Sequence, residues 1–80
     1  LKDVPHFEIT EEMNLVEFLV NHKIASSKRE AREWITAGSI TVNGEKITDL
    51  EFVVKKKDAL EETLTIVRRG KKKYYVGTWQ

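Results

Sequence analysis

Apolar residues in the segment 15–20 recur at helical spacing and cover an arc too wide for a surface helix. Asn14 precedes them and Glu17 follows three positions later, which is the spacing of an N-cap with a reciprocal carboxylate. The pattern predicts a helix buried on more than one side. His22 falls in the last turn of this helix, on the same face as Leu15. The helix dipole favours a cation in the last turn. We expect His22 to pack or cap rather than to bind a ligand.

A second helix is predicted from Ser27 to Ala37. Ser27 and Glu30 have the spacing of a capping box, and Gly38 stands where a left-handed C-terminal cap is needed. At about 100° per residue, one face of this helix is apolar and must be buried against the first helix and a sheet. That face consists of Ala31, Trp34 and Ile35.

The opposite side of this helix is basic. Arg29 points away from the apolar face, and Lys28 and Arg32 line its flank. Such cations, together with the amino-terminal dipole and backbone N–H groups of the first turn, attract phosphate. Arg29 has an alternative role that needs no ligand, because Arg29 and Glu33 can form an i, i+4 ion pair, which stabilises a helix by about 0.3–0.5 kcal/mol.

Alternating residues and turn signals predict short strands elsewhere. Asn43-Gly44 is the signal of a type I′ hairpin between 40–42 and 45–47, with the apolar positions of both strands over the helices and Lys46 facing outward. Asn43 is expected to serve turn geometry. The remaining expectations are an edge strand or arm at 7–10, a strand or loop anchor at 52–54, a surface turn or short helix at 58–63, and a last hairpin that starts at Leu64, breaks at Gly70 and resumes at Lys73.

Length and composition bound the class of protein. Eighty residues make one small domain that buries about 60% of its unfolded surface. No apolar run approaches the roughly 20 residues that span a bilayer, so we expect no membrane insertion. The absence of cysteine fits a reducing compartment, and cytoplasm is the expected location. Because the chain starts at Leu1 and shows no signal peptide, we expect a piece of a longer protein.

The net charge of +1 hides an asymmetry along the chain. Residues 1–26 hold two lysines against five acids, whereas 55–80 hold eight bases against three acids. This distribution favours a polyanionic partner over a merely solubilising surface. The bases gather in two clusters, Lys55, Lys56 and Lys57, and then Arg68, Arg69, Lys71, Lys72 and Lys73.

Catalysis by this chain alone is not expected. His6 and His22 are isolated, and the sequence has no glycine-rich phosphate loop and no paired-carboxylate motif. We therefore expect no catalytic residue, metal or cofactor. A protein-interaction module stays open, because a tail hairpin could add a strand to a partner.

One stretch carries a family resemblance, which spans about residues 15–49. It resembles the small RNA-binding domain of the S-four family, named after a ribosomal small-subunit protein. The opening arm PHFEIT and the closing hairpin LTIVRRGKKKYYVGTW are similar to the C-terminal domain of bacterial tyrosyl-tRNA synthetases. The residues of the S-four motif are Ser27-Lys28-Arg29-Glu30-Ala31-Arg32, Ile35, Gly38, Ile40, Val42-Asn43-Gly44 and Ile47.

The resemblance implies a single α+β domain over 1–80, with two packed helices against a small, mostly antiparallel sheet. It implies a partner, tyrosine tRNA, gripped at its anticodon stem and long variable arm, while an ATP-dependent ligase domain of the same parent chain performs the chemistry. The isolated domain would be a monomer and the parent a homodimer. A pseudouridine synthase or a ribosome-associated factor is the alternative parent.

Carried over residue by residue, the family's RNA surface falls on the basic helix and the first hairpin. We expect phosphate and 2′-hydroxyl contacts there, because an A-form stem is read mainly by shape. The mild pI of about 8.2 predicts weak, salt-sensitive binding. Tyr74, Tyr75 or Trp79 could stack on a splayed base, although Tyr75 is expected to pack in the core. The carried-over residues are Ser27, Lys28, Arg29, Arg32 and Lys46, with a second contact at Arg68, Arg69, Lys71, Lys72 and Lys73.

Overall fold

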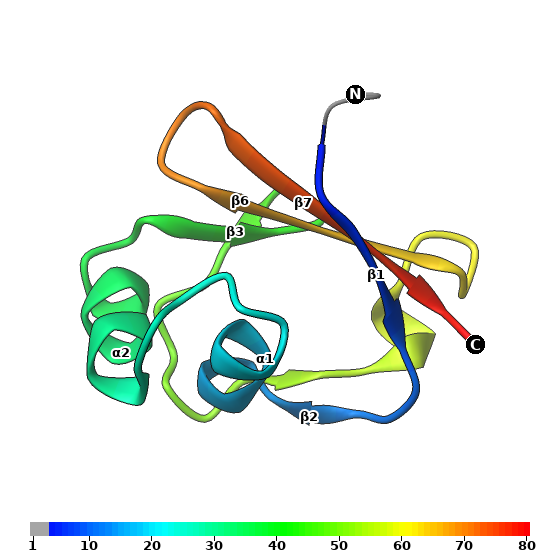
Figure 1. Ribbon diagram of the computed structural model, residues 1–80, viewed down its shortest axis with the longest axis horizontal. Coiled ribbons are helices and arrows are strands. Elements are labelled where there is room, and N and C mark those ends of the chain that lie inside the picture. Colours follow the sequence, from blue (N-terminus) through cyan, green and yellow to red (C-terminus); the bar gives the residue numbers. More distant parts are fainter. Residues whose placement is uncertain (1–3) are drawn as a thin grey trace.

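The computed structural model describes residues 4–80 as a five-stranded sheet with both helices packed on one face, beside a separate two-stranded sheet (Figure 1). The order in the larger sheet is β1-β7-β6-β3-β4 and the smaller sheet pairs β2 with β5. The elements are β1 His6–Ile9, β2 Met13–Asn14, α1 Leu15–Asn21, α2 Lys28–Thr36, β3 Ile40–Val42, β4 Glu45–Lys46, β5 Val53–Val54, the 3₁₀ helix η1 Lys56–Asp58, β6 Leu64–Arg69 and β7 Lys73–Trp79.

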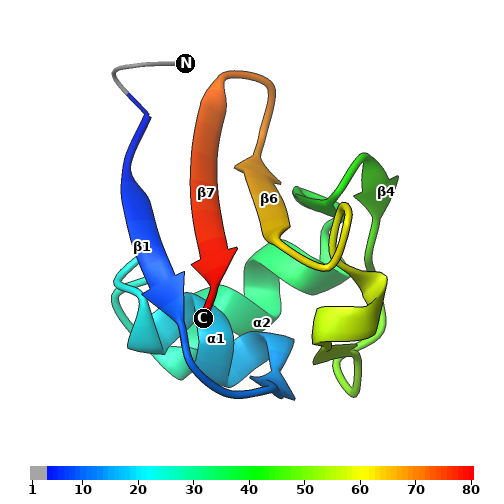
Figure 2. The same cartoon turned by 90° about the vertical axis from the view of Figure 1, so that its right-hand side faces the viewer.

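The pairing confirms the expected α+β class with a mostly antiparallel sheet. Strands β3, β4, β6 and β7 run antiparallel to their neighbours, while β1 joins the edge of β7 in parallel. Figure 2 shows β1, β7 and β6 side by side, with the helices behind and below them. The arm predicted at 7–10 is thus the edge strand β1.

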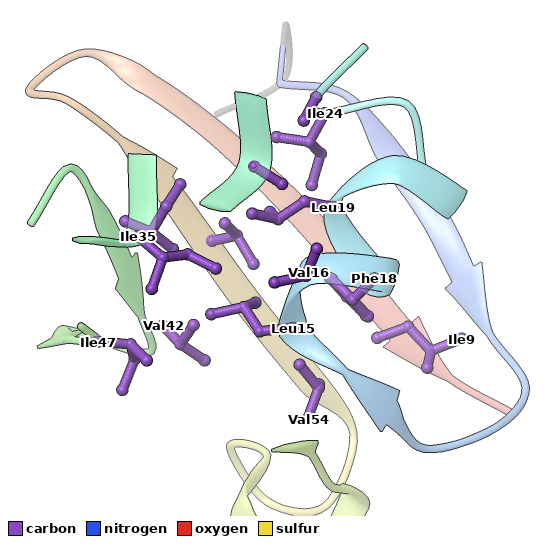
Figure 3. Close-up of a cluster of buried hydrophobic side chains, with 14 of the residues drawn as sticks. Ile9, Leu15, Val16, Phe18, Leu19, Ile24, Ile35, Val42, Ile47 and Val54 are labelled. Carbon is purple, nitrogen blue, oxygen red and sulfur yellow. The ribbon is translucent and has the colours of Figure 1, made fainter. Parts of the chain in front are cut away.

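Helix α1 forms the centre of the core. Asn14 caps it as predicted, since its Oδ1 accepts a hydrogen bond from the Val16 N–H at 2.9 Å. The Nδ2 of Asn14 donates to the Leu50 carbonyl at 2.9 Å, which ties the helix start to the loop before β5. Leu15, Phe18 and Leu19 are completely buried (Figure 3), so the helix is covered on more than one side, as its wide apolar arc predicts.

The core is one layer of side chains between the helices and the inner face of the sheet. Its most deeply buried members come from α1, α2 and three strands and are at most 1% exposed. Burying an aliphatic side chain of this size contributes about 1.5–3 kcal/mol, so this layer supplies most of the favourable energy of folding. The fully buried apolar residues are Ile9, Leu15, Phe18, Leu19, Ala31, Ile35, Ile40 and Val67.

The Asn43-Gly44 turn has the predicted geometry, with φ of 49° and 87° at its two central residues. The side chain of Asn43 also has a second role that the sequence did not reveal. Its Oδ1 accepts from the Ile66 N–H at 2.7 Å, and its Nδ2 donates to the Asp58 carbonyl at 3.2 Å. The expectation that Asn43 serves turn geometry is therefore incomplete, because it also joins the hairpin to β6 and η1.

His22 packs between two phenylalanines and is also the C-cap residue of α1, since its backbone N–H donates to the Phe18 carbonyl at 3.0 Å. Its ring stacks on Phe7 with centroids 4.2 Å apart, and the edge contact with Phe18 spans 4.6 Å. Burial lowers the pKa of His22 from its ordinary value of 6.5. Packing and capping are thus both confirmed, whereas desolvation disfavours the cation expected from the helix dipole.

Stability should consequently fall as His22 becomes protonated. Below the unfolded-chain pKa of about 6.5 the unfolded state takes up a proton that the folded state resists, so the free energy of unfolding declines until the lowered folded pKa is passed. Urea titrations between about pH 5 and 6.5 should show a smaller decline for His22→Gln than for the unaltered chain. The exposed His6, replaced by Gln, is the control, and equal declines in all three proteins would contradict this account.

Gly77 lets β1 lie against β7. A Cβ at this position would come within 2.5 Å of both Ile9 Cδ1 and Phe7 Cε1. The absence of a side chain at Gly77 is therefore what admits the two apolar residues of β1 to the core.

Gly77→Ala should lower the free energy of unfolding by about 1–3 kcal/mol, because overpacking must displace these residues. Thr78→Ala, next to it on the half-exposed opposite face, should cost less. Denaturant unfolding monitored by circular dichroism measures both, and a Gly77→Ala cost no larger than that of Thr78→Ala would refute the close approach.

Candidate nucleic-acid interface

Two serines bond to Glu30 in the first turn of α2, and Ser27 is the N-cap. Ser27 Oγ accepts from the Glu30 N–H at 3.1 Å, as predicted, but the Glu30 carboxylate accepts from the N–H and hydroxyl of Ser26 at 2.8 and 2.9 Å. The N-cap stays at Ser27, and only the reciprocal bond of the capping box is shifted back, to the N–H of Ser26. The Ser26 N–H bond is the main cause that lowers the pKa of Glu30, with the Ser26 hydroxyl next and Arg69 contributing less. An anion already lies at this helix end, so the side-chain cations of α2 are better placed to attract a further anion than its first-turn N–H groups.

The end of α2 is fixed by a Schellman motif. Gly38 has a φ of 76°, its N–H donates to the Ile35 carbonyl at 3.1 Å, and the Ser39 N–H donates to the Trp34 carbonyl at 2.9 Å. The predicted left-handed cap is confirmed. It turns the chain sharply from the helix into β3.

Three cations of α2 lie in solvent. Arg29 Nε is 3.5 Å from Glu33 Oε2, and both side chains are well exposed, at 85% and 66%. Such an exposed pair stabilises little. Within residues 4–80, neither Lys28 nor Arg32 has a carboxylate within 4 Å, and both are exposed.

Lys46 of β4 lies beside the carboxyl end of α2. Its Cδ would be 3.3 Å from a Cβ at Gly38, so the aliphatic stem runs along the glycine. The predicted outward orientation agrees with its exposure. This placement brings a fourth cation to the helix.

The turn between β6 and β7 is attached to α2 by two contacts. The Gly70 N–H donates to the Ser39 carbonyl at 2.9 Å, and the Arg69 guanidinium lies 4.6 Å from the ring centroid of Trp34. Figure 1 shows this turn and α2 on the same side of the molecule. Two clusters that are distant in sequence thus lie on the same side of the molecule, and their cations are here called the basic surface: Lys28, Arg29, Arg32, Lys46, Arg69, Lys71, Lys72 and Lys73.

Trp34 differs from its predicted place in the core. It is only partly buried, and Arg69 covers part of its ring. Trp34 points to the buried side of α2, as the helical phase predicts. However, α2 lies at the margin of the sheet, and the large indole extends past the fully buried layer. Trp34 therefore connects the core to the basic surface.

Arg68 lies apart from this surface. Neighbouring residues of a strand point to opposite faces, so Arg68 and Arg69 cannot share a side of the sheet. The Nη2 of Arg68 is 3.5 Å from Thr41 Oγ1 on the face without helices. The lysines at 55–57 are also separate, because η1 lies across the molecule from α2 (Figure 1).

The three aromatic candidates for base stacking have different environments. Trp79 is 8% exposed and its Nε1 donates to Thr65 Oγ1 at 2.8 Å, so it belongs to the core and the stacking role suggested for it is wrong. Tyr75 is partly buried and packs against the core, as expected. Tyr74 is 36% exposed and is the accessible member of the three.

A hollow of about 420 Å³ lies beside α1 and β1. Its lining includes Glu8, Glu11 and Glu17, with Lys28 at its edge, which suits no polyanion. Among residues 4–80, no three His, Cys, Asp or Glu side chains are grouped to hold a metal ion. No helix in that range is long and apolar enough to cross a membrane.

Comparison with known proteins decides the family. Residues 1–76 match the model of the tyrosine–tRNA ligase SYY-like C-terminal domain. The chain belongs to this family. It is 48% identical over 81 residues to tyrosine–tRNA ligases of Bacillus pumilus (strain SAFR-032) and of Streptococcus pneumoniae (strain Hungary19A-6), covering 99% of the chain in each case.

The chain spans 19% of the length of these ligases. A solution structure of a tyrosyl-tRNA synthetase C-terminal domain superposes with a TM-score of 0.81 at 44% identity, covering all of this chain and 82% of that one. The resemblance drawn from the sequence is therefore confirmed, and so is the fold it implied.

The contact between Arg69 and Trp34 should be measurable as an interaction energy. A double-mutant cycle with Trp34→Ala and Arg69→Ala should give a coupling of about 0.5–1 kcal/mol in unfolding free energy, the size of a partly exposed cation–π contact. The matched cycle of Trp34→Ala with Arg29→Ala should be additive, because Arg29 pairs with Glu33 instead. Equal coupling in the two cycles would show that the turn is not held in this way.

Proposed function

We propose that this domain binds tRNA, with tyrosine tRNA as its specific partner, through the basic surface. The observation that carries the proposal is the attachment of the β6–β7 turn to α2 by Gly70 and Arg69. It assembles cations from separate parts of the sequence on rigid elements. A one-sided group of this kind attracts and orients a polyanion even when the net charge is only +1.

The cations are proposed to contact phosphate and 2′-hydroxyl groups of the anticodon stem and long variable arm. An A-form stem offers these groups while its deep, narrow groove conceals the base edges. Ser27 is a minor member of the site, since its oxygen already accepts from the Glu30 N–H and only its proton is left for a phosphate oxygen. Arg68 would act from the other side of the sheet.

The parent is proposed to be an ATP-dependent tyrosine–tRNA ligase, with its chemistry in a separate domain and its location in the cytoplasm. Membership of the ligase C-terminal family supports this parent over a pseudouridine synthase or a ribosome-associated factor. We propose a monomeric isolated domain and a homodimeric parent. Tethering to the catalytic part would raise the effective concentration of a weakly binding domain.

Reversing two charges of α2 tests the proposal. Arg29→Glu with Arg32→Glu should weaken binding of fluorescently labelled tyrosine tRNA by about tenfold or more at low salt, because two phosphate contacts become repulsive. The matched control is Lys56→Glu with Lys57→Glu, which changes the net charge equally on exposed side chains outside the basic surface. It should retain most of the affinity.

Salt dependence separates contact from general attraction. Each lost phosphate contact should reduce the slope of log affinity against log salt by about one, so the α2 variant should lose about two. Circular dichroism would verify that both variants fold. Similar losses in the two variants, or equal binding of tyrosine tRNA and an unrelated tRNA, would contradict the proposal, and binding to neither at low salt would favour a protein-interaction module.

A further inference from the structure

The face of the sheet opposite the helices is uncovered within residues 4–80, since α1 and α2 both pack on the other face (Figure 1). Register places Thr41, Arg68 and Tyr74 in one row across β3, β6 and β7 on this outer face. Ile66 and Val76 form the next row. Val76 is only 8% exposed although it stands outside the main core, so this face has an apolar floor of its own.

A hollow of about 230 Å³ lies between these rows. Ile66 forms its apolar part, and the Gly44 turn is open beside it, since a Cβ at Gly44 would meet nothing within 4 Å. The volume is below the about 300–1,000 Å³ of sites for drug-sized ligands, which suits one flat ring better than a larger molecule. Its lining residues are Thr41, Gly44, Ile66, Arg68 and Tyr74.

Arg68 brings unused hydrogen-bonding capacity to this hollow. Its Nε is covered from solvent and has no partner among the described residues. Its Nη2 reaches Thr41 Oγ1 only at 3.5 Å, the outer limit of a hydrogen bond. Buried donors without partners are rare and call for a physical explanation. A bound acceptor group next to the guanidinium would supply one.

Tyr74 presents an accessible ring at the rim. It is 36% exposed and directly follows three exposed lysines, Lys71 and Lys72 of the β6–β7 turn and Lys73 at the start of β7. The hollow is therefore reached from the basic surface by passing over that turn. Arg69 lies on the face of the hairpin that packs against Trp34, and Arg68 lies on the opposite face, beside Thr41.

We propose that the hollow binds one unpaired base of an RNA whose stem lies on the basic surface. The base would stack on Tyr74 above Ile66, with its acceptor atoms or adjoining phosphate on Arg68 and the Thr41 hydroxyl nearby. Every base has a face that can stack on an aromatic ring, so this contact tolerates different sequences. The inference rests on the proposed RNA-binding function and extends it to a single-stranded contact on the opposite side of the sheet.

Fluorine NMR of the domain labelled with 3-fluorotyrosine tests this site directly. The chain has two tyrosines, and the partly buried Tyr75 is an internal reference. A single-stranded RNA hexanucleotide of mixed sequence should shift the Tyr74 signal and leave Tyr75 in place. A blunt RNA duplex should shift the Tyr74 signal less than the hexanucleotide does and should leave the Tyr75 signal in place. An unmoved Tyr74 at saturating hexanucleotide would overturn the proposal.

Affinities of variants complete the test. Tyr74→Ala should weaken hexanucleotide binding by about five- to a hundredfold, the effect of losing one base–aromatic stack, whereas Tyr74→Phe should retain it. Leu60→Ala, at an exposed apolar residue outside the hollow, is the matched control and should leave binding unchanged. Wild-type affinity in Tyr74→Ala would refute the site.

The two proposals fail separately. Arg29→Glu with Arg32→Glu should weaken duplex binding by about tenfold or more while the hexanucleotide still shifts Tyr74. Loss of the Tyr74 effects with intact tRNA binding would overturn the base site alone. Absence of tRNA binding by the unaltered domain would overturn the proposed function.

Discussion

The burial of the Ala31 and Ile35 face of α2 is the constraint on which the rest of the structure depends. A helix of nine residues is too short to be stable by itself in water, because nucleation costs more than so few hydrogen bonds return. Ala31 and Ile35 are both completely buried against the layer that α1 and the sheet contribute. The cations on the other side of α2 therefore have defined positions only because this apolar face has a partner.

The same packing explains how a nearly neutral domain can present a charged surface. Trp34 extends from the buried face to the margin of the sheet, where Arg69 lies over its ring. This contact holds the β6–β7 turn next to α2, while glutamates line the hollow near α1. Glu30 and Glu33 lie among the cations of α2, but the bases of the β6–β7 turn add positive charge on this side of the domain. A polyanion would therefore meet the domain in a preferred orientation.

Local signals in the sequence predicted most elements correctly. Ser27, Gly38 and Asn43-Gly44 determine caps and turns through interactions with near neighbours, so they can be recognised without tertiary information. The parallel pairing of β1 with β7 and the small β2–β5 sheet have no such local signature, because they join residues distant along the chain.

The candidate site was predictable in composition but not in arrangement. The clusters of cations are evident in the sequence. Only the strand register shows that Arg68 and Arg69 lie on opposite faces of the sheet. The burial of Trp79 depends on Thr65, which lies on the neighbouring strand and accepts its N–H. The hollow beside Tyr74 likewise depends on residues from three strands and the Gly44 turn.

The central claim is that α2 and the β6–β7 turn act as one RNA-binding surface. Titration of the ¹⁵N-labelled domain with tyrosine tRNA, followed by backbone amide chemical shifts, measures this most directly. The account predicts perturbations that rise together at the same RNA concentrations in residues 27–33 and 68–73, with little change in 11–17. Perturbations confined to one of the two basic segments, or centred on 11–17, would contradict it.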